Sequence, residues 1–482
     1  MARVNQTMEA ALAVTRFGLG ARPGEIEAVA ADPRRWLEAQ IRPGGAPNPA
    51  GRLFDSETRV GQLLDYNELA RERRRDEGGD DAEARFEALR DSRRELTEQT
   101  GEEFLARAQL GATTADGFAE RWALFWANLF TVSATKFQAA VLMGQYEREA
   151  IRPHVFGRFE DLAIAAEQHP AMLVYLDQAQ SVGPGSVLGE RREAGLNENL
   201  AREILELHTV GADGGYTQAD VTEFARALTG WSIPTPRNLQ APTGAGGRRR
   251  QRARAEALAG EPGRNGFVWR AAMHEPGTRI VLGRRYSQTG LDQGEAILRD
   301  LARHPATARR LARKIAAHFV ADQPPESLIA RLEAAWTRSN GDLAVVARAL
   351  VSAPEAWSPT ADKIKTPYDF VISTHRALGI SPPRVQPLNQ ALESMGQPAW
   401  RAPSPEGWPD TAADWVGPDA VVKRLNWSKA VADRVPGYDP VAVAEGALGP
   451  RLGPTSYQAI TRAESRSESL TLFLMSPEFQ RR

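Results

Sequence analysis

The stretch Asp116–Ser133, DGFAERWALFWANLFTVS, is strongly apolar and aromatic. Its large rings recur at spacings of three, four and one, which is the spacing of one buried helix face; they are Phe118, Trp122, Phe125, Trp126 and Phe130. Aromatic stripes at such spacing pack in a core far more often than they bind a cofactor. The stretch therefore predicts a buried helix.

Helical periodicity continues outward from this stretch along most of the chain. Asp32 followed by Pro33 is a helix start, because Asp can cap and Pro suits the first helical position. The best strand candidate is 266–283, GFVWRAAMHEPGTRIVLG, with a hairpin turn at 275–278. We therefore predict a mainly α fold, a single large multi-helix domain over 1–482 with a small β-hairpin element and long loops.

Within this domain, three segments differ in composition from the rest. Residues 67–108 are dense in charge and poor in apolar residues, which predicts a charged helical arm. Residues 234–266 are rich in Arg, Gly and Pro and predict a flexible insertion. Residues 382–430 are rich in Pro and Trp. Their indoles either anchor loops to the core or form a contact surface.

The composition excludes several classes of protein. The chain of 482 residues has 60 Lys and Arg against 61 Asp and Glu, an even balance that argues against a nucleic-acid partner. It has no cysteine, which removes disulfides, thiolate metal sites and cysteine nucleophiles. No run approaches the roughly 20 apolar residues of a transmembrane segment. The first residues lack the apolar core of a signal peptide, so we expect a cytoplasmic location by default, while a periplasmic one or export with a partner stays open.

The segment 196–230, LNENLAREILELHTVGADGGYTQADVTEFARALTG, carries most of the candidate chemistry. Asn197 can cap a helix that Gly211 ends, and Thr217 can cap the next one in a capping box with Asp220. A tight glycine turn at 211–216 separates the two predicted helices.

On a helical wheel the polar side of the first helix carries a ladder of Glu198, Arg202 and Glu206. Glu203 lies near the apolar boundary. His208 falls within the apolar arc, too far around the helix from Glu206 to share a metal ion with it. The ladder is either a surface ion-pair ladder worth a few tenths of a kcal/mol per pair or the wall of a recessed site.

If this face is a site, its residue types suit hydrolysis or metal binding. Carboxylates with different pKa values can act as acid and base, and carboxylate oxygens bind hard divalent cations. The candidate catalytic residues are Glu198, Glu203, Glu206 and His274, and the candidate binding residues are Asn197, Arg202, Asp220 and His208. A divalent metal is the candidate cofactor, while the metal ligands and the substrate, a small molecule or a polysaccharide, stay unassigned.

Two other interpretations remain open. The chain can be a non-catalytic binding or assembly partner of a cell-envelope protein, with the Trp-rich segment as its contact surface. Every acid above can also be purely structural. Further along, Arg310, Lys314 and His318 fall at i, i+4 and i+8 on one helix face, without an assigned role.

Six motifs distinguish this chain from a generic helical protein. They are RFGLG at 16–20, HPAMLVYLDQAQS at 169–181, LNENLAREILELHTVG at 196–211, GGYTQADVTEFARALTGW at 214–231, HEPGTRIVLG at 274–283 and SPEFQRR at 476–482. By these motifs the chain resembles, over nearly its whole length, the bacterial family known as domain of unknown function 1800. The resemblance implies a mainly helical fold without an established activity. It also implies export and a sulfatase-like envelope protein as partner, although this chain lacks a signal peptide.

Overall fold

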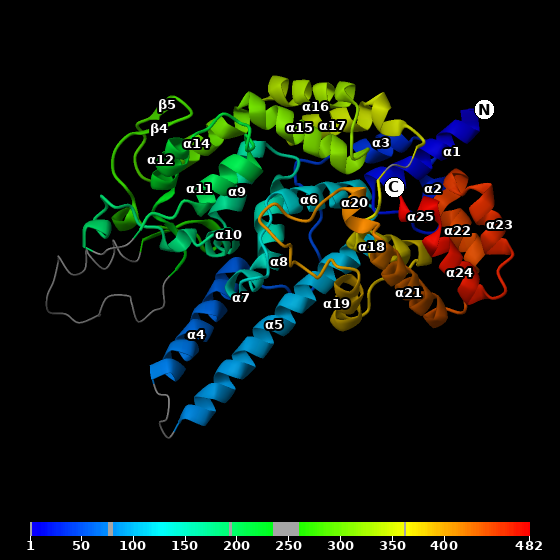
Figure 1. Ribbon diagram of the computed structural model, residues 1–482, viewed down its shortest axis with the longest axis horizontal. Helices are drawn as coiled ribbons and strands as arrows, with labels where there is room; N and C mark the ends of the chain where they lie inside the picture. The colour runs from blue at the N-terminus through cyan, green and yellow to red at the C-terminus, as the bar shows by residue number, and fades with distance from the viewer. Residues whose placement is uncertain (1, 76–80, 192–194, 235–259, 361–362) are drawn as a thin grey trace.

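The computed structural model describes residues 2–75, 81–191, 195–234, 260–360 and 363–482 (Figure 1). In these ranges helices dominate and the strands are few and short, so the prediction of a mainly α fold is confirmed. Among the described helices, none combines the length and apolar character needed to cross a bilayer.

As predicted, the aromatic stretch forms a buried helix, α6 (Gly117–Leu129), which lies at the centre of the core. Phe118 and Trp126 are fully buried. The ring of Phe118 packs against Phe17 and Phe319, with centroids 6.3 Å and 6.0 Å away. These neighbours come from opposite parts of the chain, so α6 is the element around which the other helices assemble.

The helices around α6 form successive groups along the chain. The amino-terminal helices are α1 (Ala2–Leu12), α2 (Glu25–Val29) and α3 (Pro33–Glu38). As predicted, α3 begins with Asp32, whose side chain accepts a hydrogen bond from the Arg35 N–H at 3.0 Å. Short helices and a pair of antiparallel helices follow α6; they are α7 (Phe137–Ala140), α8 (Met143–Gln145), α9 (Phe159–Gln168), α10 (Pro170–Tyr175), α11 (Asn199–Glu203) and α12 (Gln218–Leu228).

Four helices then cross the molecule as a layer above α6 (Figure 1). They are α14 (Leu291–Arg303), α15 (Pro305–Phe319), α16 (Glu326–Ser339) and α17 (Leu343–Ser352). Of the remaining helices, α21 (Pro418–Arg434), α22 (Pro440–Leu448), α23 (Pro454–Thr461), α24 (Arg466–Met475) and α25 (Pro477–Gln480) form a group on the side of the molecule where α1 and α2 lie (Figure 1). The other three are α18 (Pro367–Leu378), α19 (Val385–Ser394) and α20 (Ala412–Trp415).

A helical hairpin projects from this body (Figure 1). It consists of α4 (Ser56–Arg75) and α5 (Ala82–Thr113), and the predicted charged arm 67–108 makes up its outer part. Residues 76–80 of the arm lie outside the described residues. Buried Arg59 fastens the base of the hairpin by donating hydrogen bonds to the carbonyls of Val141 at 3.1 Å and Leu96 at 3.2 Å.

The β structure corrects the predicted hairpin. The strand β3 (Val268–Trp269) pairs with β1 (Trp231–Ser232) and β2 (Glu261–Pro262) instead of turning back at 275–278. The hairpin joins β4 (Arg279–Val281) to β5 (Arg284–Tyr286). Its turn is Leu282–Gly283, both at positive φ, as a two-residue hairpin turn requires. A 3₁₀ turn at Ala271–Met273 separates β3 from β4, so His274 follows that turn and does not sit on a hairpin.

The other two distinctive segments differ in how much of them the structure describes. Of the predicted insertion 234–266, residues 235–259 lie outside the described residues. In the Pro/Trp-rich segment 382–430, Trp400 and Trp415 are buried. Their indole N–H groups donate to Glu147 Oε1 at 2.8 Å and to the Pro409 carbonyl at 3.0 Å. These two indoles therefore anchor loops to the core and are not available as a contact surface.

The central position of α6 predicts a large effect of truncating Phe118. Phe118→Ala should lower the free energy of unfolding by about 3–5 kcal/mol, because it empties space between fully buried rings. Phe86→Ala on the projecting hairpin is the control, since the Phe86 ring is 46% exposed and should cost less than about 1 kcal/mol. Urea denaturation followed by circular dichroism measures both, and equal losses in the two variants would contradict the central role of α6.

Candidate functional site

The predicted carboxylate face starts on α11 and continues into a π-helical turn at Ile204–His208. The Asn197 side chain accepts a hydrogen bond from the Asn199 N–H at 2.9 Å, but Glu198 occupies the N-cap position and no side chain caps α11, so the predicted Asn197 cap is wrong. Gly211 ends the helical segment at a φ of 89°, a conformation that favours glycine. A π turn contains more residues than an α turn. The helical wheel, which assumes an α-helix, therefore describes the carboxylate face only before the π turn.

The structure brings the ladder together across the glycine turn. Arg202 lies between Glu198 at 3.4 Å and Glu206 at 3.7 Å. From the other side of the turn, the Thr222 hydroxyl donates to Glu198 and the Tyr216 hydroxyl donates to Glu206, each at 2.7 Å. The three ladder side chains are 29–37% exposed. The ladder is thus a partly exposed network that joins α11 to α12.

Glu203 and His208 do not take part in the hydrogen bonds that the described residues of this network form. Burial raises the pKa of Glu203, which lies within electrostatic range of Tyr175. His208 is almost fully buried, and its Nδ1 lies 2.6 Å from Glu167 Oε1.

Asp220 and His274 form their hydrogen bonds at opposite ends of α12. Asp220 completes the predicted capping box with Thr217 and accepts a further hydrogen bond from the Leu282 N–H at 2.7 Å. His274 Nδ1 donates to the Thr229 carbonyl at 2.9 Å. Thr229 is seven residues after Thr222, or about 10 Å of helical rise. The hydrogen bonds of His274 therefore lie at the far end of α12 from the partners of Glu198.

The part of the chain that the structure describes contains no group of side chains suited to binding a metal ion. No group of three or more His, Asp or Glu side chains there could hold a metal ion. The candidate divalent metal is therefore not assigned to the carboxylate face.

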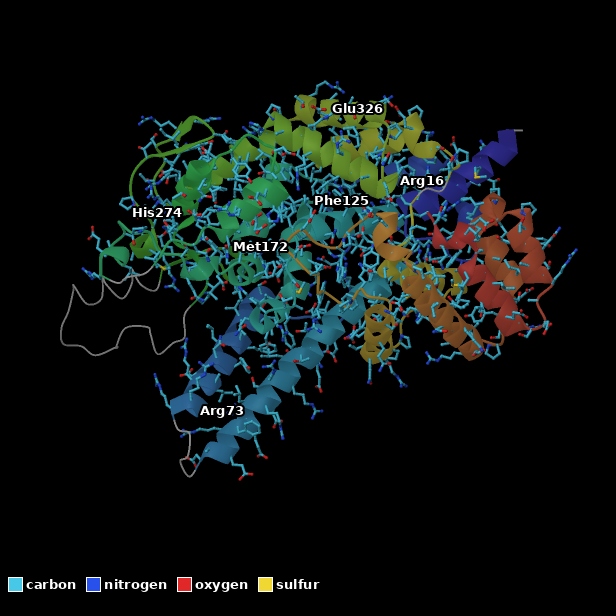
Figure 2. The ribbon with its side chains drawn as sticks, viewed as in Figure 1. Arg16, Arg73, Phe125, Met172, His274 and Glu326 are labelled. Atoms are coloured by element: carbon cyan, nitrogen blue, oxygen red, sulfur yellow. The ribbon has the colours of Figure 1, made fainter. Side chains whose placement is uncertain are left out.

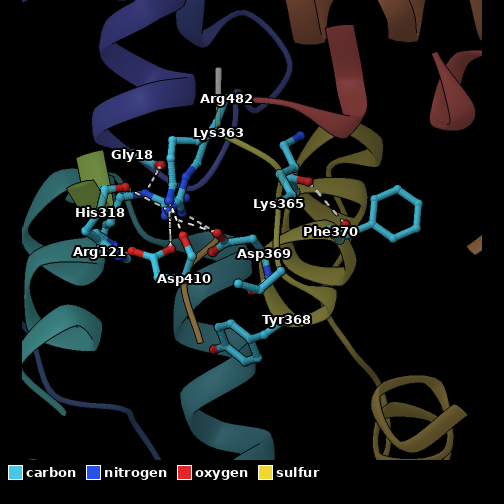
Figure 3. A network of polar contacts seen from close by, with 12 residues as sticks. Gly18, Arg121, His318, Lys363, Lys365, Tyr368, Asp369, Phe370, Asp410 and Arg482 are labelled. Carbon is cyan, nitrogen blue, oxygen red and sulfur yellow. Dashed lines mark hydrogen bonds and ion pairs between the residues drawn. The ribbon is translucent and has the colours of Figure 1, made fainter. Parts of the chain in front are cut away.

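A second polar cluster lies where α15 meets the loop before α20 (Figure 3). His318 Nδ1 lies 2.8 Å from Asp410 Oδ2. Lys363 Nζ and Arg482 Nη2 each approach the other carboxylate oxygen of Asp410 at 3.4 Å. Arg482 also donates to the His318 carbonyl at 2.9 Å. Cations therefore hold the Asp410 carboxylate, which holds the imidazole, while Arg482 also binds the backbone of His318.

The same cluster extends to α18 and α6. Asp369 on α18 forms ion pairs with Arg482 and with Arg121 of α6, the latter at 3.2 Å. Arg121 donates in turn to the Gly18 carbonyl at 2.6 Å. The side chains of Arg121, Lys363 and Arg482 are at most 3% exposed, so their charges depend on these carboxylates.

Two neighbouring cavities adjoin the cluster. Their volumes are about 120 Å³ and about 450 Å³, and the larger falls in the range of small-molecule sites. They share one wall, made by Asn128, His318, Trp408, Pro409 and Asp410. The larger cavity is also lined by Lys314, from the helix face that carries His318, and by Glu406.

The electrostatics of Asp410 define which nitrogen of His318 carries the proton. Burial alone would raise the pKa of Asp410, but the charges of His318 and Lys363 outweigh it and lower the pKa below its ordinary value. The carboxylate is therefore ionised at neutral pH and only accepts hydrogen bonds. Nδ1 of His318 must then be the donor, and in the neutral ring Nε2 is left as a proton acceptor. Among the described residues, Nε2 has no hydrogen-bond partner.

Of this cluster, sequence reasoning singled out only His318. The i, i+4, i+8 ladder of Arg310, Lys314 and His318 was visible, but its function was not. Asp410 is separated from His318 by 92 residues and sits in a loop without periodicity. The one local signal was Trp408-Pro409-Asp410, a carboxylate placed directly after a large ring and a proline.

Comparison with known proteins identifies the chain by family. No curated protein and no solved structure matches it. A family described as "Protein of unknown function (DUF1800)" matches residues 12–481. This span includes both helices of the glycine-turn segment together with His318 and Asp410, and it confirms the resemblance predicted from the motifs. The chain therefore belongs to the DUF1800 family.

Proposed function

We propose that the chain is a hydrolase-like enzyme in which His318 transfers protons at the wall of the larger cavity. The observation that carries this proposal is the pairing of His318 Nδ1 with Asp410, which leaves Nε2 unpartnered among the described residues. A carboxylate-held imidazole with one free nitrogen is the arrangement that general acid–base catalysis uses. The cavity of about 450 Å³ supplies space for a ligand beside it.

In this proposal the imidazole moves one proton in each direction. His318 Nε2 accepts a proton from a water molecule as the water oxygen bonds to the electrophilic centre of the substrate. The imidazolium then returns that proton to the leaving oxygen as its bond to the centre breaks, so His318 ends neutral. Asp410 stays ionised throughout and stabilises the imidazolium. Lys363 and Arg482 act as positioning residues for Asp410.

The carboxylate face of α11 is the second candidate for the same reaction class. Glu203 supports it, because burial raises its pKa toward the range of a general acid. In this alternative Glu203 is the acid, while Glu198 and Glu206, held by Arg202, line the approach.

A non-catalytic role in binding or assembly with a cell-envelope protein is the alternative function. It is supported by apolar side chains exposed together on one helix. Val421, Val422 and Leu425 of α21 are 43%, 54% and 44% exposed. Apolar groups gathered in this way favour contact with another protein. The sulfatase-like partner that the family resemblance implies stays a prediction.

Replacing His318 tests the proposed enzyme. His318→Gln should lower the hydrolysis rate by about 10²–10⁴-fold, because it removes the proton-transferring group. A panel of p-nitrophenyl acetate, phosphate, sulfate and glycosides measures the rate, and the free energy of unfolding is measured in parallel. The control is His304→Gln on the same helix, since His304 only caps α15 through the Ala306 N–H at 3.2 Å. It should cost stability but leave the rate unchanged.

The two candidate sites give different outcomes. Loss of the rate in His318→Gln with an intact rate in Glu203→Gln supports the cavity. The reverse pattern moves the reaction to the carboxylate face. A wild-type protein that hydrolyses none of these esters and glycosides contradicts the hydrolase proposal and favours the binding alternative.

The ionisation of Glu203 has a separate signature in stability. Burial raises the pKa of Glu203 in the folded state, so ionising it works against folding as pH rises above its ordinary value. Glu203→Gln should therefore gain stability relative to wild type at pH 7 but not at pH 4. Glu198→Gln is the matched control with the opposite sign, because the Thr222 hydroxyl lowers the pKa of Glu198.

Glu198 stabilises the fold above its unfolded pKa and loses that contribution as pH falls. Glu198→Gln should therefore lose stability at pH 7 and lose less at pH 4. Thermal unfolding at the two pH values measures both variants. The same sign in both variants would contradict the assigned environments.

A further inference from the structure

Two neighbouring cations on α15, one of them lining the larger cavity, have no hydrogen-bond or ion-pair partner among the residues that the structure describes. Lys314 lines that cavity, and Arg310 is one helical turn away on the same face. Both are largely removed from water, which lowers the pKa of each. Among the described residues, neither forms a hydrogen bond or an ion pair, and Arg310 Nη1 is buried without a partner. Buried cations are normally paired, so this arrangement is unusual.

The surroundings of Arg310 hold its side chain in place. A Cβ at Gly211 would lie 2.7 Å from Arg310 Cδ, so the side chain passes directly over the glycine turn. The charge of Arg310 also lowers the pKa of Lys314, which shows that the two cations act on each other.

One carboxylate offsets part of this charge. Glu406 lines the cavity and acts on both Arg310 and Lys314 through space, without an ion pair to either. Asp410 also acts on Lys314, but it is already bound to His318, Lys363 and Arg482. Lys314 therefore brings positive charge to the cavity that His318 also lines, and Arg310 adds its charge from one helical turn away.

We propose that Lys314 and Arg310 form a subsite for an oxyanion group of the ligand, a phosphate, sulfate or carboxylate. An oxyanion supplies the acceptors that these donors lack, and a lysine beside an arginine suits a group with several oxygens. Since Lys314 and His318 are one helical turn apart, the anionic group would be held next to the proton-transferring imidazole. The inference deepens the proposed function and rests on it for the use of this cavity.

Binding of inorganic ions tests the subsite apart from catalysis. Titration calorimetry of the full chain with sodium phosphate, sodium sulfate and sodium acetate, at constant ionic strength set by chloride, should show binding of at least one oxyanion. Lys314→Gln and Arg310→Gln should each weaken it by at least tenfold. Arg313→Gln is the matched control, because Arg313 lies on the same helix with the same charge but faces Glu326. It should bind within twofold of wild type.

Two further variants separate the explanations. His318→Gln should still bind the oxyanion even where it has lost hydrolysis, so failure of the subsite and failure of the enzyme are distinguishable. Glu406→Gln should tighten oxyanion binding, because Glu406 competes for the same cations. Absence of oxyanion binding in wild type, or an equal loss in Arg313→Gln, overturns the subsite. A Glu406→Gln variant that binds the oxyanion no more tightly than wild type shows that Glu406 does not compete for the two cations. This result also counts against the subsite.

Discussion

The ion pairs of Asp369 and Asp410 with buried cations hold the parts of the fold in register. Arg121 belongs to α6, His318 to α15, Asp369 to α18, and Arg482 to the far end of the chain. Each cation lies out of water, so leaving one of them unpaired would cost about 3–5 kcal/mol. The network is satisfied only when these elements meet in one arrangement. The cavities at its edge follow from that arrangement, because their shared wall is His318 and Asp410 with their loop neighbours.

Local signals in the sequence predict much of the fold. The aromatic spacing of α6, the Asp32 cap and the Thr217–Asp220 capping box each depend on residues within one or two helical turns. The hairpin was predicted in the right region and with the wrong pairing. Strand pairing is decided by contacts between segments that can lie far apart in the chain. The strand β3 pairs with β1, and Trp231 of β1 lies far from β3 in sequence. The alternation of apolar residues alone could not show that a 3₁₀ turn separates β3 from β4.

The site was harder to predict for the same reason. The ladder of Glu198, Arg202 and Glu206 is visible because all three residues share one short helix. The His318–Asp410 pair joins residues 92 apart, and the Asp369–Arg482 pair joins residues 113 apart. No periodicity links such positions. The sequence pattern therefore indicates carboxylates on one helix face as a candidate site, and it does not indicate a carboxylate in a Pro-rich loop.

The glycine turn at 211–216 connects the two candidate sites. In the sequence this turn is only the separator of the two predicted helices. The structure gives Gly211 a packing role as well, since any side chain there would displace Arg310. Through that approach the end of the segment 196–211 contacts α15, and α15 positions Lys314 and His318 in the lining of the cavity. At a close approach of this kind a small residue is required because the neighbouring side chain leaves no space for a larger one. Its own chemistry plays no part. The long motif of the family can therefore matter to a site one helix away, even where its own carboxylates only join α11 to α12.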